Sequence, residues 1–310
     1  MREEYNKRLP CVHKLQNADI YFRQSLCYNK YTLLYCILIL SCRDTVTGEQ
    51  IKRKISDALA RFIDSDKGNA MPAHNYMKVF DTPLIGYAAA DDALFKTFRN
   101  DTVVGACFQP PDSWLPGAAT VISYFLPFTR EIRDSNRLAG LPSEEWVSAR
   151  IDGEIFNNAV RAFLVGLIEN LGAKAVSPAA DPRFRINNNI SNWSERHVAF
   201  AAGLGTFGLH RGLITSKGTA GRFGSVVTTM CLEPVSRPYT SHNEYCLFFT
   251  SGKCGACIKR CPPAAITKQG KDNKACSDYI DNEIEPRFAP RYGCGKCNIS
   301  VPCEYSSPVG

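Results

Sequence analysis

Eight of the fourteen cysteines gather in the last part of the sequence, and their types and spacing give the clearest indication of chemistry. The first four follow the pattern C-x7-C-x2-C-x3-C-P, and the next four follow C-x17-C-x2-C-x5-C. Cysteine thiolates hold iron–sulfur clusters, and the run C-x2-C-x3-C-P is typical of bacterial ferredoxins. The eight residues are Cys246, Cys254, Cys257, Cys261, Cys276, Cys294, Cys297 and Cys303.

Two other uses of these cysteines were weighed. A disulfide framework is typical of small secreted domains, whereas 310 residues suffice to bury a core without cross-links. A zinc ribbon built from the two C-x2-C pairs would leave four neighbouring cysteines unused and would not explain Pro262 after Cys261. Two [4Fe–4S] clusters are therefore the favoured interpretation.

The ferredoxin pattern also predicts which cysteines share a cluster. In two-cluster ferredoxins the fourth cysteine of each run binds the other cluster. Two clusters in one module would form a path for single electrons, so we expect an external one-electron donor such as a ferredoxin or flavodoxin. The rule predicts one set of Cys246, Cys254, Cys257 and Cys303, and a second set of Cys261, Cys276, Cys294 and Cys297.

A glycine-rich run at 203–208 matches the pattern G-x-G-x-x-G. A dinucleotide site needs this turn between a strand and a helix, with an acidic residue about 20 positions later. Here the preceding residues are predicted helical, and no Asp or Glu occurs between Gly208 and Glu233. A nicotinamide dinucleotide site is excluded on that context. Two interpretations stay open: a plain helix-to-strand turn, or a loop whose backbone approaches a flat or anionic cofactor.

The elements that must position these residues form a mixed α and β pattern up to about residue 235. Apolar periodicity, β-branched runs and turn residues indicate each of them. The predicted helices cover 51–62, 143–172 and 194–202, and the predicted strands cover 84–88, 119–126, 173–176, 213–215 and 225–229.

Composition and charge limit the class of protein. Hydrophobic residues make up 45% and charged residues 22%, which are ordinary globular values. The net charge of +7 arises from scattered basic residues, so it permits an anionic partner without requiring one.

The apolar run from Tyr31 to Cys42 is shorter than the ~20 residues that span a bilayer as a helix. We therefore expect a cytoplasmic protein with no membrane partner.

Several segments together resemble the epoxyqueuosine reductase and reductive dehalogenase superfamily. The resemblance runs over roughly residues 50–305, with the core ahead of the cysteines as in that family. It implies a fold of class α+β: a nitroreductase-like domain over 48–235, a ferredoxin-like two-[4Fe–4S] module over 236–310, and an N-terminal extension of unknown role over 1–47. The segments are Leu115–Ala118, Ser194–His197, Gly203–Gly208, Leu213–Thr215 and Gly224–Thr229.

The resemblance also implies a cofactor and a reaction. Members of the family bind cobalamin, and electrons that pass the clusters reduce its cobalt to a strongly nucleophilic state. The cobalt chemistry belongs to the cofactor, while the protein supplies position and electrostatics. The resemblance assigns corrinoid contacts to Gly203, Gly205, Thr206, Gly208, Leu213, Ile214, Thr215 and Ser225.

Two departures from the family bear on the substrate. Epoxyqueuosine reductases carry a proton-donating aspartate six residues before the position of Glu195, where this chain has Asn189, and an amide cannot replace a carboxylic acid in proton transfer. The helical repeats that those enzymes use on tRNA have no counterpart before Gly310. We therefore expect a reductase of a small organic electrophile rather than of a nucleic acid, without excluding nucleic acid as a partner. The alternatives are an electron-transfer protein without corrinoid, or a tRNA epoxyqueuosine reductase.

Three side chains near the glycine run are candidates for the proton donor. They are Tyr124, His197 and His210. A lone histidine or tyrosine in such a segment is more often a hydrogen-bonded core residue, so each of them has a structural alternative.

Overall fold

The computed structural model describes residues 47–309, which places the apolar run at 31–42 outside the described part of the chain. The chain divides into two compact units, Met1–Ile51 and Lys52–Gly310, and the features below belong to the second. Among residues 47–309 no helix is both long enough and apolar enough to cross a membrane.

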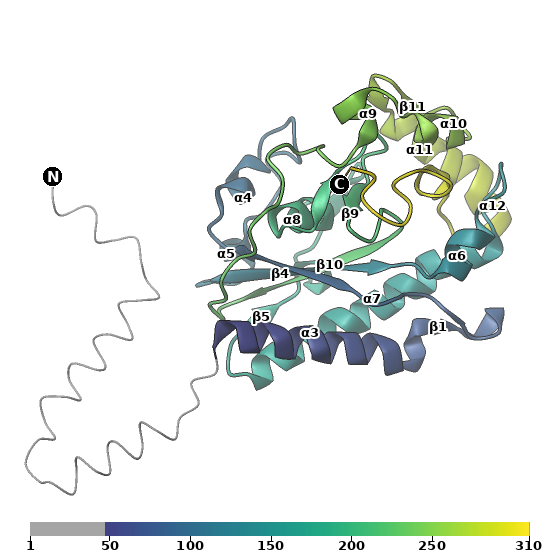
Figure 1. Cartoon of the computed structure of the whole chain (residues 1–310). Helices are drawn as coiled ribbons and strands as arrows, with labels where there is room; N and C mark the ends of the chain where they lie inside the picture. The colour runs from purple at the N-terminus through teal and green to yellow at the C-terminus, as the bar shows by residue number, and fades with distance from the viewer. Residues whose placement is uncertain (1–46, 310) are drawn as a thin grey trace, which may run out of the picture. The chain divides into compact units, whose positions relative to one another are not determined.

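A four-stranded antiparallel sheet forms the centre of the α+β core. Its strand order is β3-β4-β10-β5, and β10 pairs with β4 along its whole length (Figure 1). Every residue of β4 is buried, as expected for a β-branched and aromatic run. The strands are β3 (Leu84–Ala89), β4 (Thr120–Pro127), β5 (Ala175–Val176) and β10 (Gly221–Thr228).

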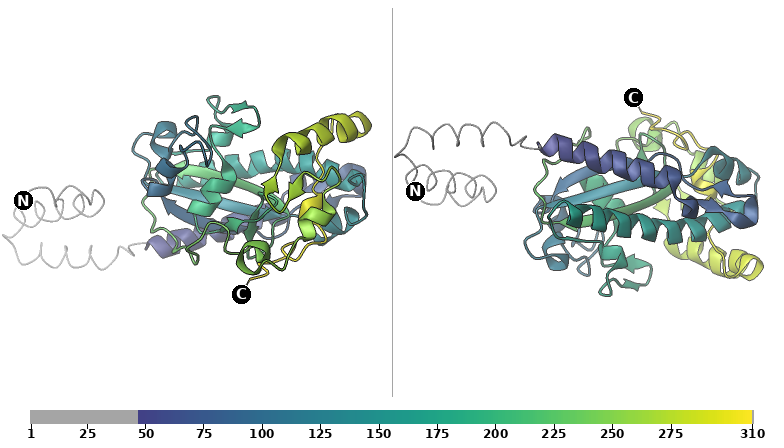
Figure 2. Two further views of the ribbon diagram at one scale, coloured as in Figure 1. Left: turned by 90° about the horizontal axis from the view of Figure 1, so that it is seen from above. Right: turned by 90° about the horizontal axis from the view of Figure 1, so that it is seen from below.

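Helices cover both faces of this sheet. The long helix α7 (Glu144–Asn170) lies below the sheet and α8 (Glu195–Ala201) lies above it in Figure 1, and Figure 2 shows α7 crossing the sheet in the view from below. Ser143 begins α7 by accepting a hydrogen bond from the backbone N–H of Trp146. Gly172, at a φ of +87°, follows its end.

Smaller elements complete the core. Two hairpins flank α8, one before it and one after it. The remaining elements of the core are α3 (Gly48–Ser65), β1 (Ala70–Met71), β2 (Met77–Lys78), α4 (Ala93–Thr97), α5 (Pro111–Trp114), α6 (Arg130–Ser135), β6 (Ile186–Asn187), β7 (Ile190–Ser191), β8 (Gly205–Phe207) and β9 (Leu213–Thr215).

The cysteine-rich module lies on the same side of the sheet as α8 (Figure 1). It consists of short elements joined by tight turns, so the positions of its cysteines depend on many local contacts. These elements are α9 (Leu247–Ser251), α10 (Ala256–Arg260), β11 (Ile266–Thr267), β12 (Gly270–Lys271), α11 (Asn273–Tyr279), a π-helical turn (Ile280–Ile284), α12 (Glu285–Phe288) and a 3-10 turn (Lys296–Asn298).

The predicted helices and strands up to residue 235 are all present, so the expected α+β class is confirmed. Two differences concern the glycines. The strand expected at 225–229 begins earlier, at Gly221, because the extended chain continues through Gly221 and Gly224. The glycine run also contains a short strand, β8, that pairs with β9. Glycine has a low strand propensity, so neither extension was visible in the sequence.

A buried lysine joins the cysteine-rich module to the core. Lys296 is 1% exposed, and its ammonium group donates to the backbone oxygens of Asn136 and Leu138 and to Oδ1 of Asn136 at 2.7–3.1 Å. Burial lowers the pKa of Lys296 to about 8. Three hydrogen bonds offset the cost of desolvating the ammonium group. They fix the 296–298 turn against the end of α6.

The neighbouring Gly295 lets the same loop lie directly on α7. Its φ is +66°, and a Cβ there would come within 2.0 Å of the Trp146 ring. Gly252 has a closely similar φ of +68° but no atom within 4 Å of such a Cβ. The two glycines share the backbone conformation and differ in the space around them, which makes them a matched pair.

We expect Gly295→Ala to lower the free energy of unfolding more than Gly252→Ala. The left-handed backbone alone costs an alanine about 1–2 kcal/mol. At position 295 the collision with Trp146 adds a further cost of about 1–3 kcal/mol. Urea unfolding of the two variants and the unaltered protein measures the difference. Equal losses would contradict the close docking of this loop on α7.

Candidate functional site

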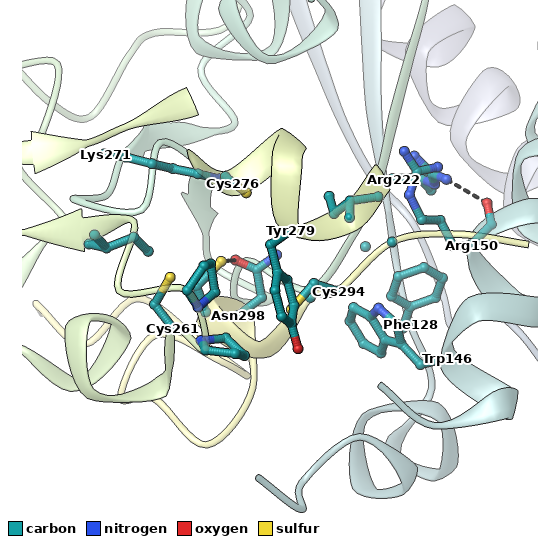
Figure 3. A pocket seen from close by; sticks show the side chains of 18 residues that line it. Phe128, Trp146, Arg150, Arg222, Cys261, Lys271, Cys276, Tyr279, Cys294 and Asn298 are labelled. Atoms are coloured by element: carbon teal, nitrogen blue, oxygen red, sulfur yellow. Dashed lines mark hydrogen bonds between the residues drawn. The ribbon is translucent and has the colours of Figure 1, made fainter. Parts of the chain in front are cut away.

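One set of four cysteines surrounds a cavity of about 230 Å³. Figure 3 shows three of them beside Tyr279, with Phe128, Trp146 and Arg222 of the core on the opposite wall. Four thiols around one cavity fit the donor set of a [4Fe–4S] cluster. The cysteines are Cys261, Cys276, Cys294 and Cys297.

The other four cysteines line a second, much smaller cavity of about 20 Å³. Leu209, Ile214, Ile266 and Val301 pack around them, so the thiols lie in an apolar environment. The four residues are Cys246, Cys254, Cys257 and Cys303. The structure thus brings the eight cysteines together in the two sets that the ferredoxin spacing rule assigns. That each set binds a cluster stays a prediction.

Helix α10 connects the two cavities. Cys257 lies within this helix and lines the smaller cavity, while Cys261 follows its last residue and lines the larger one. Ile266 is shared between them, because it packs in the apolar cluster around the smaller cavity and also lines the larger. The two sites are therefore neighbours separated by a short stretch of packed chain.

Burial favours the protonated thiol at Cys297 and Cys303. It raises the pKa of Cys303 to about 12 and that of Cys297 to about 12. Metal ligation requires thiolates, so binding releases these protons. Within residues 47–309, no three His, Cys, Asp or Glu side chains are arranged to hold a single metal ion.

The glycine-rich hairpin β8–β9 forms part of the wall of the smaller cavity. Thr206 Oγ1 accepts a hydrogen bond of 2.8 Å from the backbone N–H of Tyr245, which precedes Cys246. Ile214 and His210 line the cavity itself. Gly205 is needed for the pairing of the hairpin, because a Cβ there would lie 2.0 Å from the Ile214 carbonyl oxygen. The interpretation as a packed glycine turn accounts for this position.

The residues that the resemblance assigns to the corrinoid belong to two parts of the fold. Seven of them lie in the 203–215 segment and Ser225 lies on β10. All three hydroxyl groups are engaged within the protein: Thr206 with Tyr245, Thr215 with Gly218 and Lys217, and Ser225 with Trp193 and Glu195. These three side chains therefore have hydrogen-bond partners within the protein, and the assignment of the eight residues to a corrinoid stays a prediction.

A buried polar network lies beside Ser225. Glu195 accepts from Ser225 at 2.6 Å and faces the Arg161 guanidinium at 3.9 Å, and Arg161 also pairs with Glu154 at 2.7 Å. Burial raises the pKa of Glu195, while Arg161 and the Ser225 hydroxyl oppose that rise. Oε1 of Glu195 and Nε of Arg161 have no hydrogen-bond partner among the described residues. They retain hydrogen-bonding capacity for a polar ligand.

The three candidate proton donors lie in separate places. The Tyr124 hydroxyl is fully buried under α7 and donates to Asn157 Oδ1 at 2.8 Å, and burial raises its pKa well above the usual value. His197 pairs with the Ser194 hydroxyl at 2.7 Å, and burial lowers its pKa to about 4. His210 belongs to the wall of the smaller cavity, and burial lowers its pKa to about 3.

Asn189 lies at the tip of the exposed hairpin β6–β7. It adopts a left-handed conformation with a φ of +63°, and the neighbouring Asn188 has a φ of +50°. The side-chain amide of Asn189 donates to Ser277 Oγ at 3.4 Å. Ser277 follows Cys276 on α11, so the hairpin tip lies beside one of the cysteines that line the larger cavity.

Sequence reasoning missed two contributors to this region. Lys296 lies between Cys294 and Cys297, yet a lysine there carried no pattern that distinguished it from a surface residue. Arg161 lies in the predicted 143–172 helix, and no motif marked it as a functional residue. Its signal is faint: a charged residue on the apolar face, seven positions after Glu154 and thus on the same side of the helix.

Curated proteins with similar sequences are epoxyqueuosine reductases. The chain is 29% identical over 218 residues to the enzyme of Vibrio cholerae, a match that covers 64% of this chain and 53% of the relative. It is 30% identical over 139 residues to the enzyme of Francisella cf. novicida, covering 41% and 36%. The chain thus spans about half the length of the first of these relatives. No family model matches.

Solved structures of the same two families share the fold. An epoxyqueuosine reductase from Bacillus subtilis, with its catalytic loop swung out of the active site, matches with a TM-score of 0.51 at 16% identity, covering 84% of this chain and 67% of the other. A catabolic reductive dehalogenase in complex with 3-bromo-4-hydroxybenzoic acid matches with a TM-score of 0.50 at 13% identity, covering 72% and 30%.

These findings correct the expected partner. We expected a small-molecule substrate rather than a nucleic acid, and this expectation is wrong. The curated relatives are named epoxyqueuosine reductase, which points to a modified nucleoside and not to a free small molecule. The expectation relied on Asn189 at the position of the aspartate and on the missing helical repeats, and neither describes the local surface that contacts one nucleoside.

Sequence and fold agree on the kinship of the chain. Curated sequence relatives point to one enzyme family, and structural neighbours include that family and the reductive dehalogenases. The motifs that first indicated the relationship lie in the sheet, in the β8–β9 hairpin and in the cysteine-rich module. The resemblance of the chain to the superfamily of epoxyqueuosine reductases and reductive dehalogenases is confirmed: its curated relatives in sequence are epoxyqueuosine reductases, and its fold matches members of both families.

Proposed function

We propose that this protein is a reductase of the epoxyqueuosine reductase type that acts on a modified nucleoside in a tRNA stem loop. A nitroreductase-like domain over 48–235 precedes a ferredoxin-like module over 236–310 with two [4Fe–4S] clusters. Cobalamin is the further cofactor that the resemblance implies. Removal of an epoxide oxygen takes two electrons and two protons and yields a carbon–carbon double bond and water. An external one-electron donor supplies the electrons, one at a time.

The observation that carries the proposal is the position of the β6–β7 hairpin. Its tip contacts α11 through Asn189 and Ser277, next to Cys276. Ile186 and Ile190 of the hairpin are 61% and 47% exposed, and Arg183 and Arg185 precede it on exposed chain. Exposed apolar and arginine side chains are suited to an unstacked base and its phosphates. A flexible loop of RNA therefore has a surface to bind beside the redox module.

The chain's own residues supply the remaining parts of this function. Two sets of four thiols hold the clusters, which when bound carry single electrons. The packed chain around α10 and Ile266 keeps the two sites close together. Oε1 of Glu195 and Nε of Arg161, which have no hydrogen-bond partner among the described residues, remain available for a polar ligand near the sheet.

One observation favours a second function, an electron-transfer protein without corrinoid. The hydroxyl groups of Thr206, Thr215 and Ser225 are all engaged within the protein. Such a carrier would bind iron and sulfide, would take up no cobalamin and would leave modified tRNA unchanged.

Loss of one cysteine from either set is expected to remove about half of the iron. With two [4Fe–4S] clusters the reconstituted protein holds ~8 irons per chain, and Cys254→Ala or Cys276→Ala each leaves ~4. Cys107→Ala is the matched control, because Cys107 is free, exposed and in neither set. Iron and sulfide analysis with EPR of the reduced protein measures the result. Zinc in place of iron, or full iron content in both variants, would contradict the cluster assignment.

Asn189→Asp is expected to raise the turnover of epoxyqueuosine in a tRNA anticodon stem loop by about tenfold or more, because a carboxyl can donate a proton and an amide cannot. Asn188→Asp is the control. Asn188 is also exposed and also has a left-handed backbone conformation, but it lies one position away from the expected proton donor. The assay uses cluster-loaded protein with cobalamin and a chemical reductant, and mass spectrometry detects the queuosine product.

Three results would overturn the proposal. The first is iron-loaded protein that takes up no cobalamin and leaves the stem loop unchanged in every variant, which is the behaviour of the electron carrier. The second is equal stimulation by the aspartates at 188 and 189, which would reduce the effect to added charge. The third is stem-loop binding that does not weaken with salt, because phosphate contacts release counterions.

A further inference from the structure

His210 occupies a closed slot between two glycines. It is 3% exposed, and a Cβ on Gly208 or Gly212 would come within 2.8 Å or 2.7 Å of its imidazole ring. The last glycine of the G-x-G-x-x-G run therefore leaves room for this ring. A slot that admits one ring orientation fixes where the two nitrogens point.

Hydrogen bonding determines which nitrogen carries the proton. The backbone N–H of Gly212 donates to Nδ1 of His210 at 2.9 Å. A nitrogen that accepts a hydrogen bond carries no hydrogen, so the proton of the neutral ring lies on Nε2. Nε2 lies 3.6 Å from Sγ of Cys303, within hydrogen-bonding distance for sulfur. The slot thus directs an N–H group at one cysteine of the smaller cavity.

We propose that His210 is a positioning residue that raises the reduction potential of the cluster bound by Cys246, Cys254, Cys257 and Cys303. The inference rests on the cluster assignment in the proposed function. Reduction places more negative charge on the cluster and on its sulfur ligands. A hydrogen bond donated to Cys303 Sγ stabilises that charge, so the reduced form gains more than the oxidised form.

The rest of the hairpin supports this role. Thr206 fixes the backbone N–H of Tyr245 beside Cys246, and Ile214 packs in the apolar cluster that contains Cys303. The hairpin therefore lies beside two of the four cysteines, Cys246 and Cys303, and it carries His210, the hydrogen-bond donor. A low-dielectric environment strengthens a hydrogen bond of this kind.

His210→Phe tests the inference because it keeps a ring and removes the donor. At a fixed applied potential, we expect the ratio of reduced to oxidised cluster to fall about tenfold, which corresponds to 59 mV for a one-electron couple. His210→Gln is expected to restore the ratio, since its amide nitrogen reaches the position of Nε2. Potentiometric EPR titration of the reconstituted full chain measures both. The signal of this cluster is the one that Cys254→Ala removes, and the other cluster serves as the internal control.

A second measurement needs no variant. In protein labelled with ¹⁵N-histidine, pulsed EPR of the reduced cluster is expected to show one histidine nitrogen and one exchangeable proton coupled to it. Bound iron with no such coupling, or an unchanged potential in His210→Phe, would overturn the inference and leave the proposed function standing. Failure of the chain to bind any iron would overturn both. Loss of tRNA activity with the coupling intact would overturn the proposed function alone.

Discussion

One buried ammonium group determines where the second set of cysteines can lie. Lys296 stands between Cys294 and Cys297, and its three hydrogen bonds end on Asn136 and Leu138 of the core. A buried charge without partners would cost several kcal/mol, so the chain has one favourable way to bury this lysine. The larger cavity, the contact of the Gly295 loop with α7, and the positions of Cys294 and Cys297 depend on that geometry.

Elements with strong local patterns were predictable from the sequence, and those held by glycine were not. The strand β4 and the helix α7 follow from apolar runs and from a serine cap that physical rules recognise directly. The strand β8 depends on the approach of Gly205 to the Ile214 carbonyl, a contact between residues of two different strands. Sequence periodicity contains no information about such close approaches, so the glycine run remained open between two interpretations.

The same distinction holds for the candidate site: the cysteine sets were predictable from local spacing, and the positions of the other side chains were not. Covalent spacing restricts the cysteines strongly, and the two sets could be assigned from the pattern before any coordinate was known. His210 and Tyr124 were named only for their chemistry, and the fold places one beside Cys303 and the other under α7. The substrate class was inferred from one residue, Asn189, and from the absence of the helical repeats, and neither describes the surface that meets the substrate. Recognition of a single nucleoside depends instead on a few contacts, such as those open to the β6–β7 hairpin.

The order of the cysteines along the chain interleaves the two sites. The smaller cavity takes Cys257 and then Cys303, and the larger takes Cys261 and Cys294 from between them. Either site can open only if α10 or the segment at 303 moves, and each of these movements disturbs the other site. The cysteine-rich module is therefore one interleaved unit of chain rather than two tandem halves. A chelator that empties one site therefore also loosens chain that packs around the other, even where the second cluster stays bound.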